Sequence, residues 1–354
     1  MSEQIALRPA LSAHGSALLP AVEVESYNVA LKDDEGFVGD RASKGAFRKF
    51  LEQWRKPLRK IGLDPFGDEP SKALPTKQLD DVLVGGDHEA AGIVQGAIED
   101  FARELALVTQ RFLKLKGWKD MERLVAGGGF SGSRVGELAI GHACALLKAE
   151  HIKLDVTTVS RDPDQAGLIG AVHLAPAWIF AAHDAILAVD IGGTNIRVGI
   201  IELNLKRAAD LSKAKVWKFE LWRHGDGKLD RSDAVQGLIE MIERLIKRAD
   251  KEGLRLAPFI GIGCPGTIEP DGTIARGAQN LPGNWEKSGR FNLPRALGEA
   301  IPKIGEHDTV ILMNNDAVVQ GLSELPRLQD IERWGIFTIG TGLGNALFRN
   351  RGGD

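Results

Sequence analysis

Residues 186–203 read ILAVDIGGTNIRVGIIEL, two apolar segments of strand length joined by a turn that is rich in glycine. Residues 337–348, FTIGTGLGNALF, repeat this design near the end of the sequence. Short apolar runs bounded by glycine turns are typical of buried strands. The repeat therefore predicts two related strand–turn–strand hairpins, and the rest of the chain has to be arranged around them.

The first turn has the residue types that hold phosphate. Backbone N–H groups bind phosphate well when they point into one concavity, and glycine allows the close approach and the positive φ that this needs. Asp190, at the strand end, is a candidate ligand for hydrated Mg²⁺. A plain hairpin without any ligand is the competing interpretation, since glycine pairs are common in hairpins. The candidate phosphate-binding residues are Gly192, Gly193, Thr194 and Asn195.

Two further glycine turns strengthen the phosphate interpretation. The second hairpin suggests a related half-site facing the same polyphosphate. Residues 126–133, AGGGFSGS, link a predicted strand to a predicted helix, where N–H groups and the helix dipole favour an anion or the polar edge of a nucleotide. Ordinary turns remain the alternative for each turn taken alone. The candidate residues are Gly340, Thr341, Gly342 and Gly344 in the hairpin, and Gly127, Gly128 and Gly129 in the loop.

Periodicity along the chain predicts strands mixed with helices, which indicates an α/β protein with mixed sheets. The length of 354 residues, 43% of them apolar, is sufficient for two domains of ordinary size. The expected strands are 21–31, 186–190, 196–203, 215–222, 258–264, 308–313, 334–340 and 345–349. The expected helices are 44–60, 89–114, about 233–250 and one that begins near 316. In addition, residues 121–150 are expected to form a strand, a glycine turn and a helix, and residues 154–180 a strand, a polar loop and a helix.

Composition excludes several classes of protein. A formal net charge of −3 argues against a nucleic-acid binder that relies on bulk positive charge. We find neither a membrane span nor a signal peptide. Cys144 and Cys264 are the two cysteines, too few for a disulfide framework or a Cys-rich zinc knuckle, so a cytoplasmic protein is the default expectation.

Polar residues that follow a predicted strand indicate where chemistry could occur. In MNNDAVVQG, Asp316 is either a helix N-cap or a general base at the carboxyl end of a strand, where open α/β sheets place their ligands. The loops 262–272 and 277–285 combine glycine, proline and amides with Trp285. Amides and an aromatic plate suit a polyol, whereas ordinary turn chemistry explains the same residues without a ligand.

Taken in order, DIGGTN, CPG, NLPGNW, NNDA and GTGLG resemble the ROK family of sugar kinases over residues 186–349. The resemblance implies two ribonuclease-H-like, actin-like ATPase lobes around a central cleft, with ATP and Mg²⁺ as cofactors. It also implies that Asp316 is the general base and that Asp190 positions the metal. The glycine turns would hold the phosphates and the adenosine, and the sugar would contact Asn315, Gly266 and Asn280.

The family continues past GTGLG into its second lobe, whereas this chain ends ten residues after Gly344. Its later motifs resemble segments near the front, AGGG at 126–129 and AGLIGA at 166–171. We therefore interpret the sequence as a circular permutation. A truncated lobe fused to an unrelated domain is the alternative. The expected division is 1–185 for most of the second lobe, 186–330 for the first lobe and 331–354 for the first two strands of the second lobe.

One family feature is missing. No Glu-x-Gly-His motif and no Cys-rich zinc segment follow GTGLG, so zinc is not expected. After permutation the place of the motif falls near residues 1–40, where His14, Glu23 and Glu25 are candidates without the expected spacing.

The sequence therefore predicts ATP-dependent phosphorylation of a sugar hydroxyl by a glucokinase-like hexose kinase. Its partners would be small molecules, with neither nucleic acid nor membrane among them. Whether the protein forms a homodimer is left open. Two alternatives remain. One is a sugar-responsive ROK-type regulator, although the basic segment 42–62 forms one predicted helix where a helix-turn-helix needs two. The other is a sugar-binding protein without turnover.

Overall fold

The structure is a computed structural model, and it describes residues 11–226, 229–286 and 291–351. The chain divides into two compact units. Unit 1 contains residues 1–24, 167–326 and 350–354, and unit 2 contains residues 25–166 and 327–349. One long segment therefore builds most of each unit, and the short segment 327–349 completes unit 2 from near the other end of the sequence.

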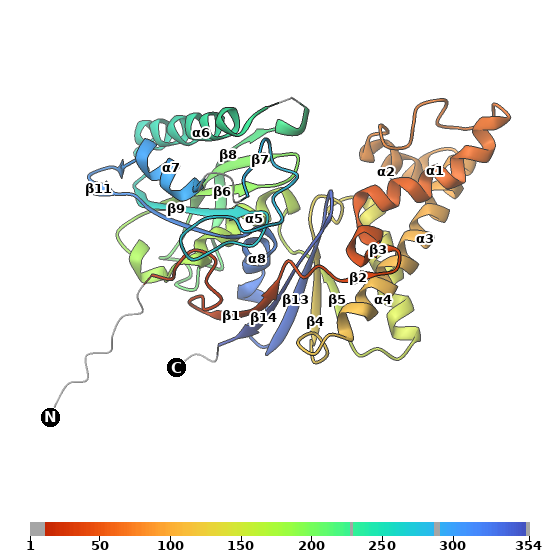
Figure 1. Cartoon of the computed structure of the whole chain (residues 1–354), viewed down its shortest axis with the longest axis horizontal. Helices are drawn as coiled ribbons and strands as arrows, with labels where there is room; N and C mark the ends of the chain where they lie inside the picture. The colour runs from red at the N-terminus through yellow and green to blue at the C-terminus, as the bar shows by residue number, and fades with distance from the viewer. Residues whose placement is uncertain (1–10, 227–228, 287–290, 352–354) are drawn as a thin grey trace. The chain divides into compact units, whose positions relative to one another are not determined.

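Unit 1 is built on a five-stranded sheet in the order β12-β9-β6-β7-β8 (Figure 1). The strands β6, β7 and β8 form an antiparallel meander, and β9 and β12 continue the sheet parallel to β6. The carboxyl ends of β6, β9 and β12 therefore meet at one edge. The bounds are β6 Ala185–Ile191, β7 Ile196–Glu202, β8 Lys215–Trp222, β9 Leu256–Cys264 and β12 Val310–Asn315.

Helices cover this sheet because each has an apolar face and a capped start. The helix α6 (Arg231–Lys251) begins with a capping box in which Asp230 and Asp233 bond each other's backbone N–H. Its buried stripe packs on the sheet with residues of α7. The other elements of unit 1 are α7 Leu293–Ala300, α8 Asp316–Leu322, β10 Lys303–Ile304, β11 His307–Asp308, and the 3₁₀ turns η2 Ala171–Leu174, η3 Ala177–Phe180 and η4 His224–Asp226.

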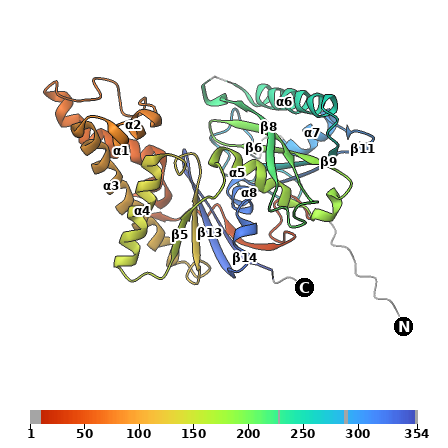
Figure 2. The ribbon, with the colours of Figure 1, turned by 180° about the vertical axis from the view of Figure 1, so that it is seen from behind.

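Unit 2 contains a second five-stranded sheet, in the order β1-β14-β13-β4-β5 (Figure 2). The strands β13 and β14 are antiparallel, and β4 and β5 follow parallel to β13. Two backbone bonds, Asn28 N–H to Asn345 O and Arg351 N–H to Ala21 O, join β1 to β14 in antiparallel direction. The bounds are β1 Val22–Tyr27, β4 Arg123–Gly127, β5 Asp155–Thr158, β13 Arg333–Ile339 and β14 Leu343–Asn350.

A helical layer packs on the sheet of unit 2 through an aromatic core. The rings of Phe47, Phe101 and Phe130 lie 5.0–6.0 Å apart and tie α1 to α3 and to the loop after β4. The elements are α1 Lys44–Lys60, α2 Thr76–Gly85, α3 His88–Leu113, α4 Arg134–Ala149, α5 Pro163–Gly170, β2 Lys32–Asp33, β3 Gly36–Phe37, and the 3₁₀ turns η1 Val38–Ala42 and η5 Leu325–Arg327. Two of these elements, α5 and η5, cross the boundary between the units.

The α/β fold with mixed sheets is confirmed, and the two sheets share one strand order. Unit 1 reads β-β-β-α-β-α-β-α along the chain, from β6 to α8. In unit 2 the strands β13, β14, β1, β4 and β5 take the same places in the sheet as β6, β7, β8, β9 and β12 in unit 1. Within the described residues no helix is long and apolar enough to cross a membrane.

Candidate active site

The predicted acid–base residues of unit 1 meet at the carboxyl edge of its parallel strands. In the sheet register, Asp190 on β6 is level with Gly263 on β9, and Gly263 is level with Asn314 on β12. Asp316 follows β12 directly as the first residue of α8. Because Gly263 has no side chain, it leaves room for the first turns of α8. A Cβ atom at this position would lie 3.2 Å from Val319 of α8.

Asp316 has a strongly perturbed pKa. Burial of the carboxyl, together with the negative charge of Asp190, raises its pKa to about 7. The same environment raises the pKa of the buried Cys264 thiol well above its usual value, through burial first and then the two carboxylates. A carboxyl with a pKa near neutrality, at a strand end, can accept a proton at physiological pH.

Asp190 is held in place by two contacts that sequence patterns did not indicate. An Nη1 atom of Arg197, its partner across the hairpin, lies 3.3 Å from Oδ2 of Asp190, and both side chains are mostly buried. On the other side Gly167 approaches so closely that a Cβ atom would lie 2.6 Å from the carboxyl carbon. The segment AGLIGA therefore belongs to this site, because only glycine fits against the carboxylate.

The turn after β6 is supported from behind. Gly192 N–H donates to Asn195 O at 2.8 Å and closes the turn. The buried ring of His224 lies with Nε2 2.9 Å from Gly192 O, and Gly225 N–H donates to Thr194 O. His224 belongs to no recognised sequence motif, so a role for it was not predicted. The N–H groups of Gly193 and Thr194 donate no backbone hydrogen bond within the described residues, which leaves them for a ligand.

The side-chain amide of Asn315 makes hydrogen bonds within the protein that connect the start of α8 to the loop after β9. Its Oδ1 caps α8 by accepting from the N–H groups of Ala317 and Val318, and its Nδ2 donates to Gly266 O at 3.0 Å. Gly266 has φ +102°, and a Cβ atom there would lie 2.6 Å from Arg276 O, so glycine is required at this turn. With its side chain buried and its hydrogen bonds made, Asn315 fits a positioning role.

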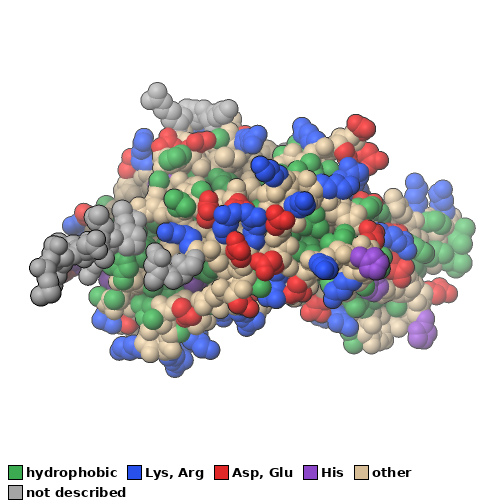
Figure 3. Space-filling model, turned by 90° about the horizontal axis from the view of Figure 1, so that it is seen from below, with side chains coloured by type: hydrophobic (Ala, Val, Ile, Leu, Met, Phe, Trp, Pro, Cys, Tyr) green, Lys and Arg blue, Asp and Glu red, His purple; other side chains and the backbone are tan. Residues whose placement is uncertain are grey.

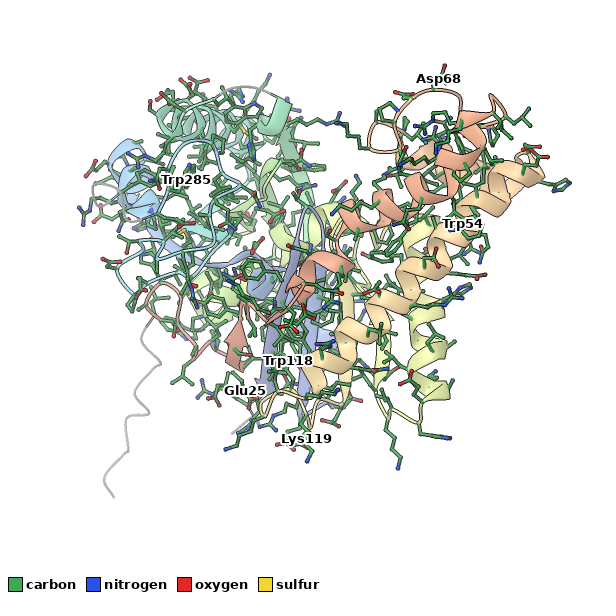
Figure 4. All side chains as sticks on the ribbon, turned by 45° about the vertical axis from the view of Figure 1, so that its right-hand side comes forward. Glu25, Trp54, Asp68, Trp118, Lys119 and Trp285 are labelled. Atoms are coloured by element: carbon green, nitrogen blue, oxygen red, sulfur yellow. The ribbon has the colours of Figure 1, made fainter. Side chains whose placement is uncertain are left out.

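The loop 280–285, NLPGNW, presents polar groups but no exposed aromatic ring. Asn280 is exposed and accessible to a ligand. Trp285 is fully buried against Phe291 and donates from Nε1 to Pro282 O (Figure 4). The expectation that Trp285 forms a plate under a sugar ring is therefore wrong, because the ring is needed in the core of unit 1.

The predicted nucleotide turns lie together at the corresponding edge of unit 2. In the register, Thr338 near the end of β13 is level with Gly127 at the end of β4. Gly128 has φ +84°, and a Cβ atom there would lie 2.6 Å from Ile339 O. Phe130 N–H also donates to Ile339 O. The loop 128–133 therefore packs closely on the base of the second hairpin.

The tip of the second hairpin is open on one side and supported on the other. Gly340 N–H donates to Gly342 O, and nothing lies within 4 Å of a Cβ atom built on Gly342. Lys44 N–H, at the start of α1, donates to Gly340 O at 2.9 Å. Thr341 is exposed at the tip. The exposed backbone of this turn resembles that of the first hairpin.

The candidates for the missing Glu-x-Gly-His motif do not form one cluster. His14 accepts at Nδ1 from Met313 N–H in unit 1, and burial lowers its pKa. Glu25 is paired with Arg333 and Arg349 in unit 2. Glu23 is partly exposed. Within the described part of the chain, no group of three or more His, Cys, Asp or Glu side chains could hold a metal ion.

Comparison with known proteins matches the half of the chain that carries these motifs. Residues 186–352 match the profile of the ROK family. The matched segment covers a little under half of this chain. A beta-glucoside kinase from Listeria monocytogenes is 31% identical over 172 residues, which cover 47% of each chain. This chain therefore aligns with about half the length of that relative.

A solved structure, the ROK hexokinase from Thermus thermophilus, is 22% identical, with a TM-score of 0.31 over 48% of this chain and 49% of that one. The matched segment contains Asp190, Asp316 and both glycine hairpins, and it leaves the loop 126–129 outside.

Proposed function

We propose that this protein is an ATP-dependent sugar kinase of the hexose kinase type. The observation that carries the proposal is Asp316, whose pKa of about 7 and position beside Asp190 and the first glycine turn suit a general base for a hydroxyl. The ROK match over residues 186–352 and the kinase name of the Listeria relative support the same activity.

In the proposed reaction, Asp316 takes the proton of the acceptor hydroxyl while that oxygen forms a bond to the γ-phosphorus of ATP. The bond between this phosphorus and the β–γ bridging oxygen breaks, and ADP leaves. Asn315 keeps Asp316 in position through its bonds to α8 and to Gly266. Phosphoryl transfer depends mainly on such positioning and on neutralisation of charge.

The phosphates are assigned to the glycine turns. The N–H groups of Gly193 and Thr194 face no described acceptor, so they can bind phosphate oxygens. Gly340–Gly344 would bind phosphate in the same way in unit 2, and Gly127–Gly129 would lie along the adenosine. We propose Asn280, on its exposed loop, as a ligand of sugar hydroxyls.

Two carboxylates fit a divalent metal that is bound mostly by water and phosphate. The charge of Asp190 helps to raise the pKa of Asp316, so the two carboxylates lie near each other, and Mg²⁺ uses one or two carboxylates in such sites. Asp190, fixed by Arg197, would hold the ion, which would neutralise charge on the transferring phosphoryl group. Its pairing with Arg197 orients the carboxylate.

We also propose that the chain is a circular permutation of a ROK kinase. The strand order of unit 2 supports it. In this sheet β1 lies next to β14, just as β8 lies next to β7 in unit 1, although β1 and β14 come from opposite ends of the sequence. Arg351, the last described residue, bonds the backbone of Leu19 and Ala21, so the end of β14 lies beside the segment that leads into β1. The permutation also predicts that Met1 and Asp354 lie near each other, and both of these residues are outside the described part of the chain.

Moving the ends of the chain tests the permutation. A rearranged protein would start at His183, before β6, and join Arg351 to Leu11 through a short Gly/Ser linker. We expect it to fold and to keep its activity, since the cut lies between η3 and β6. Failure to fold, while a second linker length also fails, would contradict the permutation and favour two unrelated fused parts.

The activity is tested by ADP release from Mg·ATP across hexoses, their N-acetylated amines and β-glucosides. Sugar-dependent release would support the kinase. Thermal stabilisation by a sugar without ADP release would favour a binding protein, and sugar-sensitive DNA binding would favour a regulator. Charges of both signs mix on the face seen in Figure 3, which offers no single basic surface for DNA. We propose a cytoplasmic enzyme, with a homodimer as the first assembly to examine.

A further inference from the structure

A lysine that no motif indicated lies at the nucleotide edge of unit 2. Lys44 is the first residue of α1, and its N–H group donates to Gly340 O at the base of the second hairpin. Its backbone is therefore fixed directly beside the turn to which phosphate is assigned. The side chain stays accessible to solvent at this place.

Three loops surround this position. The hairpin 340–342 and the loop 128–133 follow β13 and β4, whose parallel carboxyl ends meet at one edge of the sheet. The start of α5 adds Pro163, whose ring lies 2.9 Å from a Cβ atom built on Gly132. Open α/β sheets bind their ligands at such an edge. Lys44 is thus placed by tertiary structure at the expected nucleotide position.

The ammonium group of Lys44 is not used by the fold. Among the described residues it makes neither a hydrogen bond nor an ion pair within 4.0 Å, and Asp164 acts on it only at longer range. Its neighbour Arg48 is committed, since its guanidinium donates to Ser71 O and to Thr76 Oγ1. Partial burial and the charge of Arg48 lower the pKa of Lys44.

We infer that the ammonium group of Lys44 binds a phosphate of the nucleotide held by unit 2. This inference rests on the proposed kinase function and assigns to it a residue outside the ROK-matched segment. A phosphate oxygen would supply the ion pair that the protein does not, next to an open turn of glycines. Lysine suits this task as a mobile point charge.

Direct binding measurements test the inference without a known sugar. ATP, ADP and adenosine would be titrated by calorimetry into the wild type and into the Lys44→Met, Lys44→Arg and Lys49→Met proteins. Lys49 is the matched control, an exposed lysine on another face of the same helix. Thermal melts of all four proteins would establish that each is folded.

Lys44→Met should weaken ATP and ADP binding by roughly 10-fold or more, as expected for the loss of a charge-assisted bond, and leave adenosine unchanged. Lys44→Arg should retain most of the affinity, and Lys49→Met all of it. Equal affinity of Lys44→Met and Lys49→Met for ATP would overturn the inference. So would an equal loss for ATP and adenosine, which would indicate a contact to the nucleoside or a structural role.

The same data separate this inference from the proposed function. If the wild type binds ATP but phosphorylates no sugar, the kinase proposal fails while the Lys44 comparison still gives its answer. If the wild type phosphorylates a sugar and Lys44→Met keeps the wild-type KM for ATP, the kinase stands and the role of Lys44 is wrong. Absence of any ATP or ADP binding by the wild type would overturn both.

Discussion

The two sheets of this protein have the same strand order, yet their strand ends carry different chemistry. In unit 1 the glycine turn is supported by His224 and lies beside two carboxylates, Asp190 and Asp316. In unit 2 the corresponding turn is supported by the backbone of Lys44 and lies beside a second glycine loop. The comparison suggests that one architecture was used twice, once for proton transfer and once for holding the nucleotide.

The two units should also differ in what keeps them folded, and Arg55 in unit 2 gives the largest expected effect. Its guanidinium is completely buried, with Nε 3.1 Å from Asp64 and further bonds to Ser71 and Glu69. Arg55→Met would remove the buried guanidinium that joins Asp64, Ser71 and Glu69, and it would leave Asp64 with Arg59 as its remaining ion-pair partner. We expect unfolding free energy to fall by about 3–5 kcal/mol.

Hydrogen exchange would show where this loss occurs. Amides of β4 and β13 in unit 2 should exchange faster in Arg55→Met, whereas those of β6 and β9 in unit 1 should change less. Arg103→Met is the control, because Arg103 forms only exposed pairs with Glu99 and Asp100. A stability change in the control as large as that in Arg55→Met would contradict this account.

Gly170 offers the matching test in unit 1, with a smaller effect. A Cβ atom there would lie 1.7 Å from Val319 O, so Gly170→Ala must push α5 away from α8. We expect a loss of about 1–3 kcal/mol in denaturant unfolding, from overpacking. Gly141→Ala in α4 meets nothing within 4 Å and should instead stabilise the protein by about 0.5–1 kcal/mol.

The pair of glycine variants separates steric contact from helix propensity. If both alanines changed stability by the same amount and in the same direction, the close packing of α5 on α8 would be disproved.

Asp316 should make unit 1 less stable as pH rises. Its pKa of about 7 in the folded protein lies above the unfolded value of 3.8, so the folded state binds the extra proton between these values. Stability is therefore lost as pH increases from about 4 to 7. Asp316→Asn should remove this slope and stabilise the protein at pH 8 by roughly 1–3 kcal/mol.

Urea unfolding at pH 5 and at pH 8 would measure this difference in both proteins. Equal stabilities of the wild type and Asp316→Asn at pH 8, with parallel pH profiles, would contradict a raised pKa for Asp316.

Much of the fold could be predicted because local patterns were strong. The glycine hairpins, the strand 215–222 and the helix 44–60 agree with the structure, although Pro57 lies inside that helix. The helices α2 and α7 were not predicted, since each is short and its apolar pattern spans few turns. The strand β1, which contains Glu25 (Figure 4), pairs with β14 from near the other end of the sequence, and no local pattern indicates that pairing.

The residues of the candidate site also divide into those that could be predicted from the sequence and those that could not. Asp190 and Asp316 could be predicted because each follows an apolar strand within a motif. Arg197, Gly167 and His224 could not, since their importance comes from contacts across the hairpin or from distant segments. Trp285 was misplaced because a sequence shows an aromatic residue but not the core that buries it.

The most direct test of the central claim is the turnover of the best sugar substrate by the wild type and by Asp316→Asn, between pH 5 and pH 9. The account predicts a wild-type kcat that rises with pH around an apparent pKa near 7, and a loss of roughly 10²- to 10⁴-fold in the folded variant. A variant with near wild-type kcat, or a wild-type profile that is flat across this range, would contradict Asp316 as the general base.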